Sequence, residues 1–168
     1  MIRRVVCIVL ACAAMAGPSW AELRVAPHDR IENGTTGTCA WCSIEMLGRA
    51  HGIKEIRGLA AYYQKLGKRG TTVEDADAEL TKRGIKHKVY AAGIIRKWDS
   101  LEWAGTKKGL VIGVIDWPAR GDCHAILVIN WKDKKAIFID PNDPHSRYEV
   151  GDEWLDRHWT GWAVAIWK

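Results

Sequence analysis

The sequence predicts an α+β fold in which helices from the first half of the chain pack on an antiparallel sheet from the second half. In residues 39–84 the apolar side chains recur at helical spacing. From residue 85 onward they alternate or form short runs bounded by Gly, Pro and Asp, which is typical of strands. No repeat or linker divides residues 22–168, so we expect them to form one domain.

Three helices are expected in the first half. The first starts close to Cys39, in the segment CAWCSIEMLGRAHG. The second lies within residues 53–67, IKEIRGLAAYYQKLG. The third lies within residues 71–84, where Thr71 and Glu74 form a capping-box pattern.

The second half is expected to consist mainly of short strands. The segment WKDKK joins two of them as a hairpin. Short helices are expected at residues 94–105 and 153–159. The expected strands are residues 85–92, 110–117, 123–131, 135–140, 147–150 and 161–168.

Residues 1–21 have the pattern of a secretory signal peptide. Arg3 and Arg4 precede an apolar stretch, which ends in helix breakers and the small-residue end Ser-Trp-Ala. The apolar run is shorter than the roughly 20 residues that span a bilayer. We therefore expect cleavage after Ala21, a secreted or periplasmic mature chain, and no stable membrane association. Acylation at Cys12 is the alternative, but it leaves almost no apolar region before the cut.

The charge of the chain is mildly basic and identifies no partner. The whole sequence has a net charge of +5, and residues 22–168 hold 23 basic and 20 acidic residues. Nucleic-acid binding usually shows as a clustered basic stripe or a known motif. Here the basic residues are scattered, so no nucleic-acid partner is expected.

The cysteines give the first indication of chemistry. Two of the five fall in the predicted leader, which leaves Cys39, Cys42 and Cys123. An odd number in an exported protein implies a free thiol. Cys39 stands where a helix begins, and the free amides and dipole of a helix N-terminus stabilise a thiolate. We therefore predict Cys39 as a nucleophile, whose own N–H and the side-chain amide of Asn33 can serve an oxyanion.

Cys42 is the rival nucleophile, since it also precedes a helical segment. It falls inside the first helical turn, and the residue six positions before it, Thr36, has no side-chain amide. Cys39 is therefore preferred.

A base and its orienting group are expected across a hairpin. His124 begins an apolar strand, and Asp140 ends the next one. A hairpin returns its second strand beside its first, so the two residues can become neighbours. Cys39, His124 and Asp140 are thus predicted as a catalytic triad.

The segment NGTTGTCAWCS resembles the papain-family pattern Gln-Gly-x-x-Gly-Ser-Cys-Trp-x-x-Ser. Asn33 stands in place of the family glutamine, and Trp41 stands one place later than the family tryptophan. The order of His, strand, hairpin and Asp-Pro is similar to that of the bacteriocin-leader-processing (double-glycine) peptidases. The positions that match the papain-family pattern are Gly34, Gly37, Thr38, Cys39 and Ser43.

The resemblance implies a papain-like cysteine peptidase fold. We expect a monomeric enzyme without a cofactor. The resemblance also implies hydrolysis of a peptide or protein substrate through a thioacyl-enzyme intermediate, with cleavage after small residues such as Gly-Gly. An NlpC-type cell-wall amidase or endopeptidase, which also uses a Cys-His pair, is the alternative within the hydrolases.

Two alternatives come from other classes. Cys39 and Cys42 form a CxxC motif, as in thiol-disulfide exchange proteins, although a Gly/Thr loop rather than a buried strand precedes it. Structural zinc bound by Cys39, Cys42, Cys123 and His124 is the second alternative. The CxxC spacing suits zinc, but a Cys-His pair adjacent in a strand points to opposite faces.

A third possibility is a Cys42–Cys123 disulfide, because these are the thiols that remain when Cys39 is reserved for catalysis. It would tie the nucleophile helix to the base strand. Against it, Cys123 would point away from the face that carries His124 unless the strand begins after Cys123.

Overall fold

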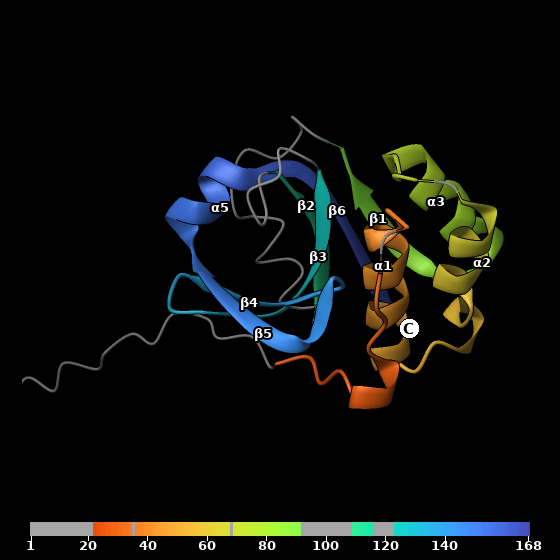
Figure 1. Cartoon of the computed structure of the whole chain (residues 1–168), viewed down its shortest axis with the longest axis horizontal. Coiled ribbons are helices and arrows are strands. Elements are labelled where there is room, and N and C mark those ends of the chain that lie inside the picture. Colours follow the sequence, from red (N-terminus) through yellow and green to blue (C-terminus); the bar gives the residue numbers. More distant parts are fainter. Residues whose placement is uncertain (1–21, 35, 68, 92–108, 116–122) are drawn as a thin grey trace, which may run out of the picture.

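The computed structural model describes residues 22–34, 36–67, 69–91, 109–115 and 123–168. Its centre is a six-stranded antiparallel sheet with the strand order β1-β6-β2-β3-β4-β5 (Figure 1). The strands are β1 (Lys86–Tyr90), β2 (Leu110–Val114), β3 (His124–Lys132), β4 (Lys135–Asp140), β5 (Asp143–Gly151) and β6 (Trp159–Trp167).

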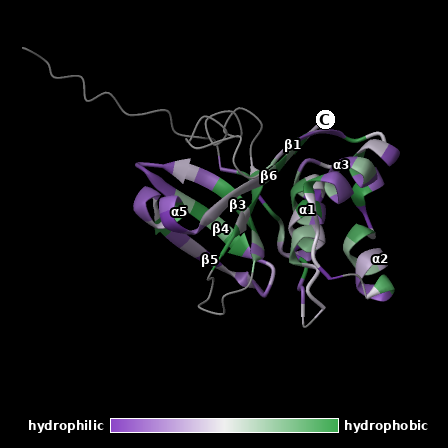
Figure 2. Cartoon of the chain, turned by 90° about the horizontal axis from the view of Figure 1, so that it is seen from above, coloured by the Kyte–Doolittle hydropathy of each residue, from purple (hydrophilic) through white to green (hydrophobic). Residues whose placement is uncertain are grey.

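The helices cover the two sides of this sheet unequally. α1 (Cys39–Ala50), α2 (Leu59–Leu66) and α3 (Val73–Lys82) lie on one side, and α5 (Asp152–His158) lies on the other (Figure 1). α1 packs directly on β3, β2 and β6. Much of the sheet is hydrophobic (Figure 2), and its two faces contribute to separate cores, one under α1 and one under α5. The α+β fold expected from the sequence is therefore confirmed.

The predicted helices that lie within the described residues are present, with two corrections at their ends. α1 begins at Cys39, as expected. α2 begins only at Leu59, because Gly58 adopts a left-handed conformation (φ 81°) and interrupts the predicted segment after the 3-10 turn Lys54–Ile56. The capping box of α3 is formed by Thr72 and Asp75, one residue later than the predicted Thr71 and Glu74.

The strands also agree with the prediction, apart from β5. That strand begins at Asp143 rather than residue 147, because its pairing with β4 extends to Asp140 opposite Asp143. The turn of the predicted β3–β4 hairpin contains Asp133 and Lys134, both with positive φ, as in a type I′ turn. The predicted leader and the predicted helix at residues 94–105 lie outside the described residues.

This topology brings together the three sequence segments that the candidate site needs. The antiparallel β3–β4 pair sets the beginning of β3 near the end of β4. α1 packs against β3, with its first turn at Cys39. Among the described helices, none is long and apolar enough to cross a membrane.

Candidate active site

Cys39 is the first residue of α1. The Thr38 carbonyl accepts the first helical hydrogen bond, from the Cys42 N–H at 3.1 Å. The backbone N–H groups of the first helical turn have no partner within the helix, and the helix dipole is positive at this end. The first turn of α1 therefore offers free N–H donors and the positive end of the helix dipole to a negative charge that develops near Cys39.

His124 and Asp140 form a buried pair at the neighbouring ends of β3 and β4. His124 Nε2 lies 2.7 Å from Asp140 Oδ1, and the two residues are only 7% and 4% exposed. The backbone N–H of Asn142 donates to the same Asp140 oxygen at 2.7 Å. The hairpin thus makes neighbours of two residues that are 16 positions apart in the sequence.

The surroundings of His124 favour its protonated form. Burial by itself lowers the pKa of His124, but hydrogen bonds with Asp140 and Cys39 outweigh burial and raise this pKa from 6.5 to about 9. Because Nε2 faces Asp140, Nδ1 is the ring nitrogen left for Cys39. A protonated imidazole between a thiolate and a carboxylate is the charge arrangement that activates a cysteine.

Asn33 is buried between the nucleophile loop and the loop that follows β4. Its Oδ1 accepts a hydrogen bond from the Thr38 backbone N–H at 2.8 Å, and its Nδ2 donates to Asn142 Oδ1 at 2.9 Å. Its own backbone N–H donates to the Pro141 carbonyl at 2.7 Å. The structure thus places Asn33 against Thr38, the neighbour of Cys39, with its amide nitrogen held by Asn142.

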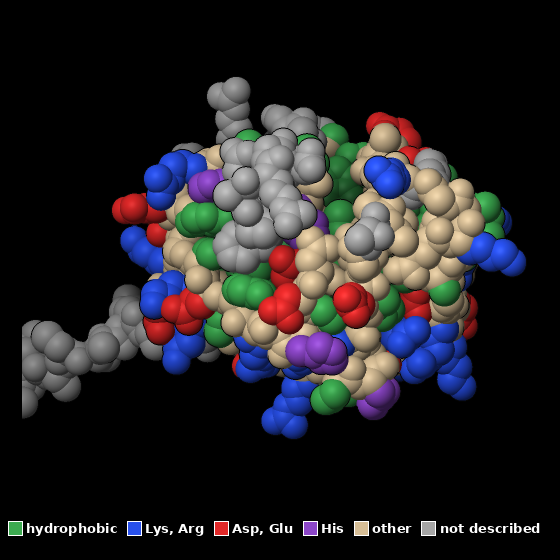
Figure 3. All heavy atoms as spheres, in the orientation of Figure 1, with side chains coloured by type: hydrophobic (Ala, Val, Ile, Leu, Met, Phe, Trp, Pro, Cys, Tyr) green, Lys and Arg blue, Asp and Glu red, His purple; other side chains and the backbone are tan. Residues whose placement is uncertain are grey.

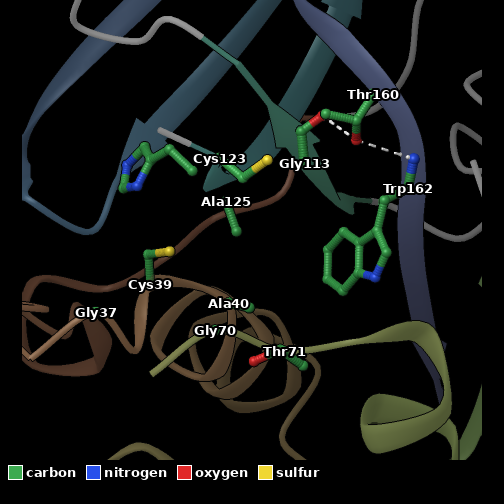
Figure 4. A pocket seen from close by; sticks show the side chains of 11 residues that line it. Gly37, Cys39, Ala40, Gly70, Thr71, Gly113, Cys123, Ala125, Thr160 and Trp162 are labelled. Carbon is green, nitrogen blue, oxygen red and sulfur yellow. Dashed lines mark hydrogen bonds between the residues drawn. The ribbon is translucent and has the colours of Figure 1, made fainter. Parts of the chain in front are cut away.

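A cavity of about 180 Å³ opens beside Cys39 (Figure 4). Trp162 lies across it from Cys39, and Thr160 Oγ1 accepts from the Trp162 N–H and donates to the Gly113 carbonyl. The lining residues come from α1 and the loop before it, the segment before α3, β2, β3 and β6: Gly37, Cys39, Ala40, Gly70, Thr71, Gly113, Cys123, His124, Ala125, Thr160 and Trp162.

Sequence reasoning did not find most of this cavity wall. Gly113 and Trp162 lie on separate strands that adjoin in the sheet only because β6 pairs with β2. A Cβ atom on Gly113 would come within 2.8 Å of Thr160 Oγ1, so the absence of a side chain there is a packing requirement. In the sequence, residues 161–168 were predicted only as a strand, with nothing to mark Trp162 as a cavity residue.

The possible Cys42–Cys123 disulfide is not formed in the structure, where both residues are free thiols. Cys42 is buried on α1, with its Sγ near Thr38 Oγ1, the Glu32 carbonyl and Gln64 Nε2. Cys123 is exposed and lines the cavity instead. Because β3 begins at His124, Cys123 precedes the strand and the alternation of strand faces does not apply to it.

The CxxC pair is not bonded either, since Cys39 is also a free thiol. Burial is the main cause that raises the pKa of Cys42 to about 12, which opposes thiolate formation at that residue.

Within the described residues, no three His, Cys, Asp or Glu side chains are grouped as a metal site would require. On the face shown in Figure 3, basic and acidic side chains are interspersed around the edge of the molecule.

The chain was compared with known proteins. No protein-family model and no curated protein matches it. Solved structures do. The peptidase domain of Streptococcus ComA, a bifunctional ABC transporter of a quorum-sensing pathway, matches with a TM-score of 0.62 and 20% identity, over 81% of this chain and 95% of that one. A C39-like peptidase from Bacillus anthracis matches with a TM-score of 0.66 and 14% identity, over 90% and 98%.

A third solved structure is a double-glycine-motif protease from an AMS/PCAT transporter, in complex with the leader peptide. It matches with a TM-score of 0.52 and 15% identity, over 88% of this chain and 92% of that one. Identities this low show a shared fold. The chain therefore has the fold of the C39-like, papain-like cysteine peptidase domains, as the resemblance of its sequence predicted.

Proposed function

We propose that this protein is an exported cysteine peptidase that hydrolyses peptide bonds with Cys39, His124 and Asp140. The observation that carries the proposal is the buried His124–Asp140 hydrogen bond of 2.7 Å, placed beside a cysteine that starts a helix and faces a cavity. The peptidase domains that share the fold support it.

Acylation begins with the Cys39 thiolate and the His124 imidazolium. The Cys39 Sγ attacks the carbonyl carbon of the scissile bond, a C–S bond forms, and the carbonyl electrons move to oxygen. The Cys39 backbone N–H and the Asn33 amide are the donors available to that oxyanion. His124 then gives its proton to the leaving nitrogen, the C–N bond breaks, and a thioester remains on Cys39.

Deacylation runs through the same groups with water in place of the amine. Neutral His124 takes a proton from water as the oxygen attacks the thioester carbon. Collapse of the second tetrahedral intermediate breaks the C–S bond, which releases the carboxylic acid product and restores the thiolate and the imidazolium. Asp140 keeps the ring oriented in both halves and stabilises its charge.

The substrate is proposed to be a peptide or protein, and the enzyme to act in the periplasm or outside the cell. The peptide complex of the double-glycine-motif protease supports a peptide substrate. The leader pattern of residues 1–21 supports export.

Active-site labelling followed by peptide mapping tests the proposed nucleophile. Native protein treated with limiting iodoacetamide near pH 7 should be alkylated first at Cys39, and Cys42 should stay protected because it is buried and has a raised pKa. Cys123 is the internal control for exposure alone, since it is exposed but does not start a helix. Labelling of Cys123 before Cys39 would contradict the assignment of the nucleophile.

Substitution tests the roles of the three residues. Cys39→Ala should abolish turnover of casein-derived fluorogenic peptides and keep the fold, because little core volume is lost. His124→Ala should lose activity as deeply, and Asp140→Ala should lose less because Asp140 acts on the ring and not on the substrate. Full activity in Cys39→Ala, with native circular dichroism, would refute the mechanism.

A further inference from the structure

A chain of hydrogen bonds leads from the base to the nucleophile by a second route. Asp140 Oδ1 holds His124 Nε2 and also accepts the Asn142 backbone N–H. The Asn142 side chain accepts from Asn33 Nδ2 at 2.9 Å, and Asn33 Oδ1 accepts the Thr38 backbone N–H at 2.8 Å. Thr38 is bonded to Cys39, whose side chain contacts His124, so the ring of contacts closes.

We propose that Asn142 is a positioning residue that orients the Asn33 amide for the oxyanion, and so couples the oxyanion donor to the Asp140 that orients the base. The inference rests on the proposed peptidase function. It follows from the two bonds that Asn142 makes, one from its backbone to Asp140 and one from its side chain to Asn33.

The contacts show how the shorter Asn33 side chain is held at the position where the papain pattern has glutamine. The Asn33 amide has two N–H bonds and one carbonyl oxygen. Thr38 fixes the oxygen end, and Asn142 engages one of the two N–H bonds. With both ends fixed the amide plane is fixed, and the second N–H keeps one direction without reorganisation during the reaction.

The contact is also reinforced by the backbone. The Asn33 N–H donates to the Pro141 carbonyl, so the nucleophile loop and the loop after β4 are joined next to the side-chain bond. Removal of the Asn142 side chain leaves this backbone bond and the bond to Asp140 in place. Because Asn142 is exposed, its truncation also opens no core cavity. Asn142→Ala therefore removes the hydrogen bond to the Asn33 amide and leaves the neighbouring contacts in place.

Two reactions of Cys39 separate positioning from structural damage. Hydrolysis of p-nitrophenyl acetate passes through a tetrahedral oxyanion, whereas alkylation by iodoacetamide displaces iodide from carbon and forms no oxyanion. Asn142→Ala should lower the Cys39-dependent ester acylation rate about 10-fold. It should leave the iodoacetamide rate and its pH profile unchanged, because the thiolate and His124 are not touched.

A double-mutant cycle tests whether Asn142 acts through Asn33. Asn33→Ala should lower ester acylation by roughly 10²- to 10³-fold. In that background, Asn142→Ala should cost nothing further. The matched control is His145→Ala, an exposed side chain in the same segment, which should react at the wild-type rate in both assays.

Several results would overturn the proposal. Additive losses in the double mutant would show that Asn142 does not act through Asn33. An equal fall in alkylation and acylation in Asn142→Ala would assign it a purely structural role, and an unchanged acylation rate would remove it from the site. Failure of the peptidase proposal looks different, because wild type and Cys39→Ala would then hydrolyse the ester equally.

Discussion

The charge on His124 is determined by the residues that surround it. A buried imidazole is normally held neutral, because burial disfavours the charged form. Here the hydrogen bonds with Asp140 and Cys39 reverse that tendency and raise the pKa to about 9. With this pKa the ring is protonated at pH 7, which is the state that the proposed acylation step requires.

An NMR titration of the His124 imidazole should therefore give a midpoint near pH 9, against 6.5 for an unperturbed histidine. In Asp140→Asn the midpoint should fall, since the carboxylate that accepts from Nε2 is lost. Asp77→Asn is the control, because Asp77 bonds a different histidine, His87. A His124 midpoint at or below 6.5 in the wild type would contradict the proposed ion pair.

The same pKa fixes the direction of a stability change with pH. The folded-state pKa of His124 is higher than its unfolded value, so the folded chain binds the proton more tightly. The stabilisation from this group is complete below about pH 6.5 and is lost as the pH rises from there through about 9.

Among the elements, the capping box of α3 was predicted one residue too early. Thr71 and Thr72 both precede the helix, and both have an acidic residue three positions later. The pattern alone does not choose between them. In the structure Thr72 Oγ1 accepts from the Asp75 N–H at 3.1 Å, whereas Thr71 lines the cavity and its buried hydroxyl has no partner among the described residues.

Thr72→Ala should accordingly lower the free energy of unfolding by about 1 kcal/mol, because an N-terminal amide of α3 loses its side-chain acceptor. Thr71→Ala is the matched control and should cost less, since it removes a hydroxyl that caps nothing. Urea denaturation, analysed with one m-value for both variants, measures the two changes in the free energy of unfolding. A larger loss at Thr71 would show that the predicted cap, and not the observed one, holds the helix.

At the scale of the whole molecule, local patterns predicted the elements and left their arrangement open. The strand segments were identified because alternation and turn residues are local signals. The sheet order was not predicted, because the insertion of β6 between β1 and β2 depends on contacts between distant segments.

The candidate site likewise contains contacts that a local pattern predicts and contacts that it does not. His124 and Asp140 were predicted to meet because one hairpin joins them. The bond between Asn33 and Asn142 spans 109 positions, and no local pattern encodes it. The side-chain direction of Cys123 was not predicted either, because it depends on whether β3 begins at residue 123 or 124, and strand ends are not fixed by a local pattern.

The N-terminal segment after the predicted leader is part of the folded domain. The Leu23 N–H donates to the Ile129 carbonyl at 2.8 Å, and Leu23 and Val25 are buried in the core under α1. Glu22, the first residue after the predicted cut, is exposed and forms an ion pair with Arg147. A cut after Ala21 would therefore spare every one of these contacts, whereas a cut after Val25 would remove them all.

Expression of the full chain in a bacterial host should give processed protein that begins at Glu22, as measured by intact mass and N-terminal sequencing.

A chain that begins at Glu22 should have a higher free energy of unfolding than one that begins at Ala26. The difference should be roughly 1.5–3 kcal/mol for each of the buried side chains of Leu23 and Val25. The variant Glu22→Gln is the control, since it removes an exposed charge and should change stability by less than about 1 kcal/mol. Equal stability of the two truncated chains would contradict the stabilising role of Leu23 and Val25. A lipid found on Cys12 would contradict cleavage after Ala21.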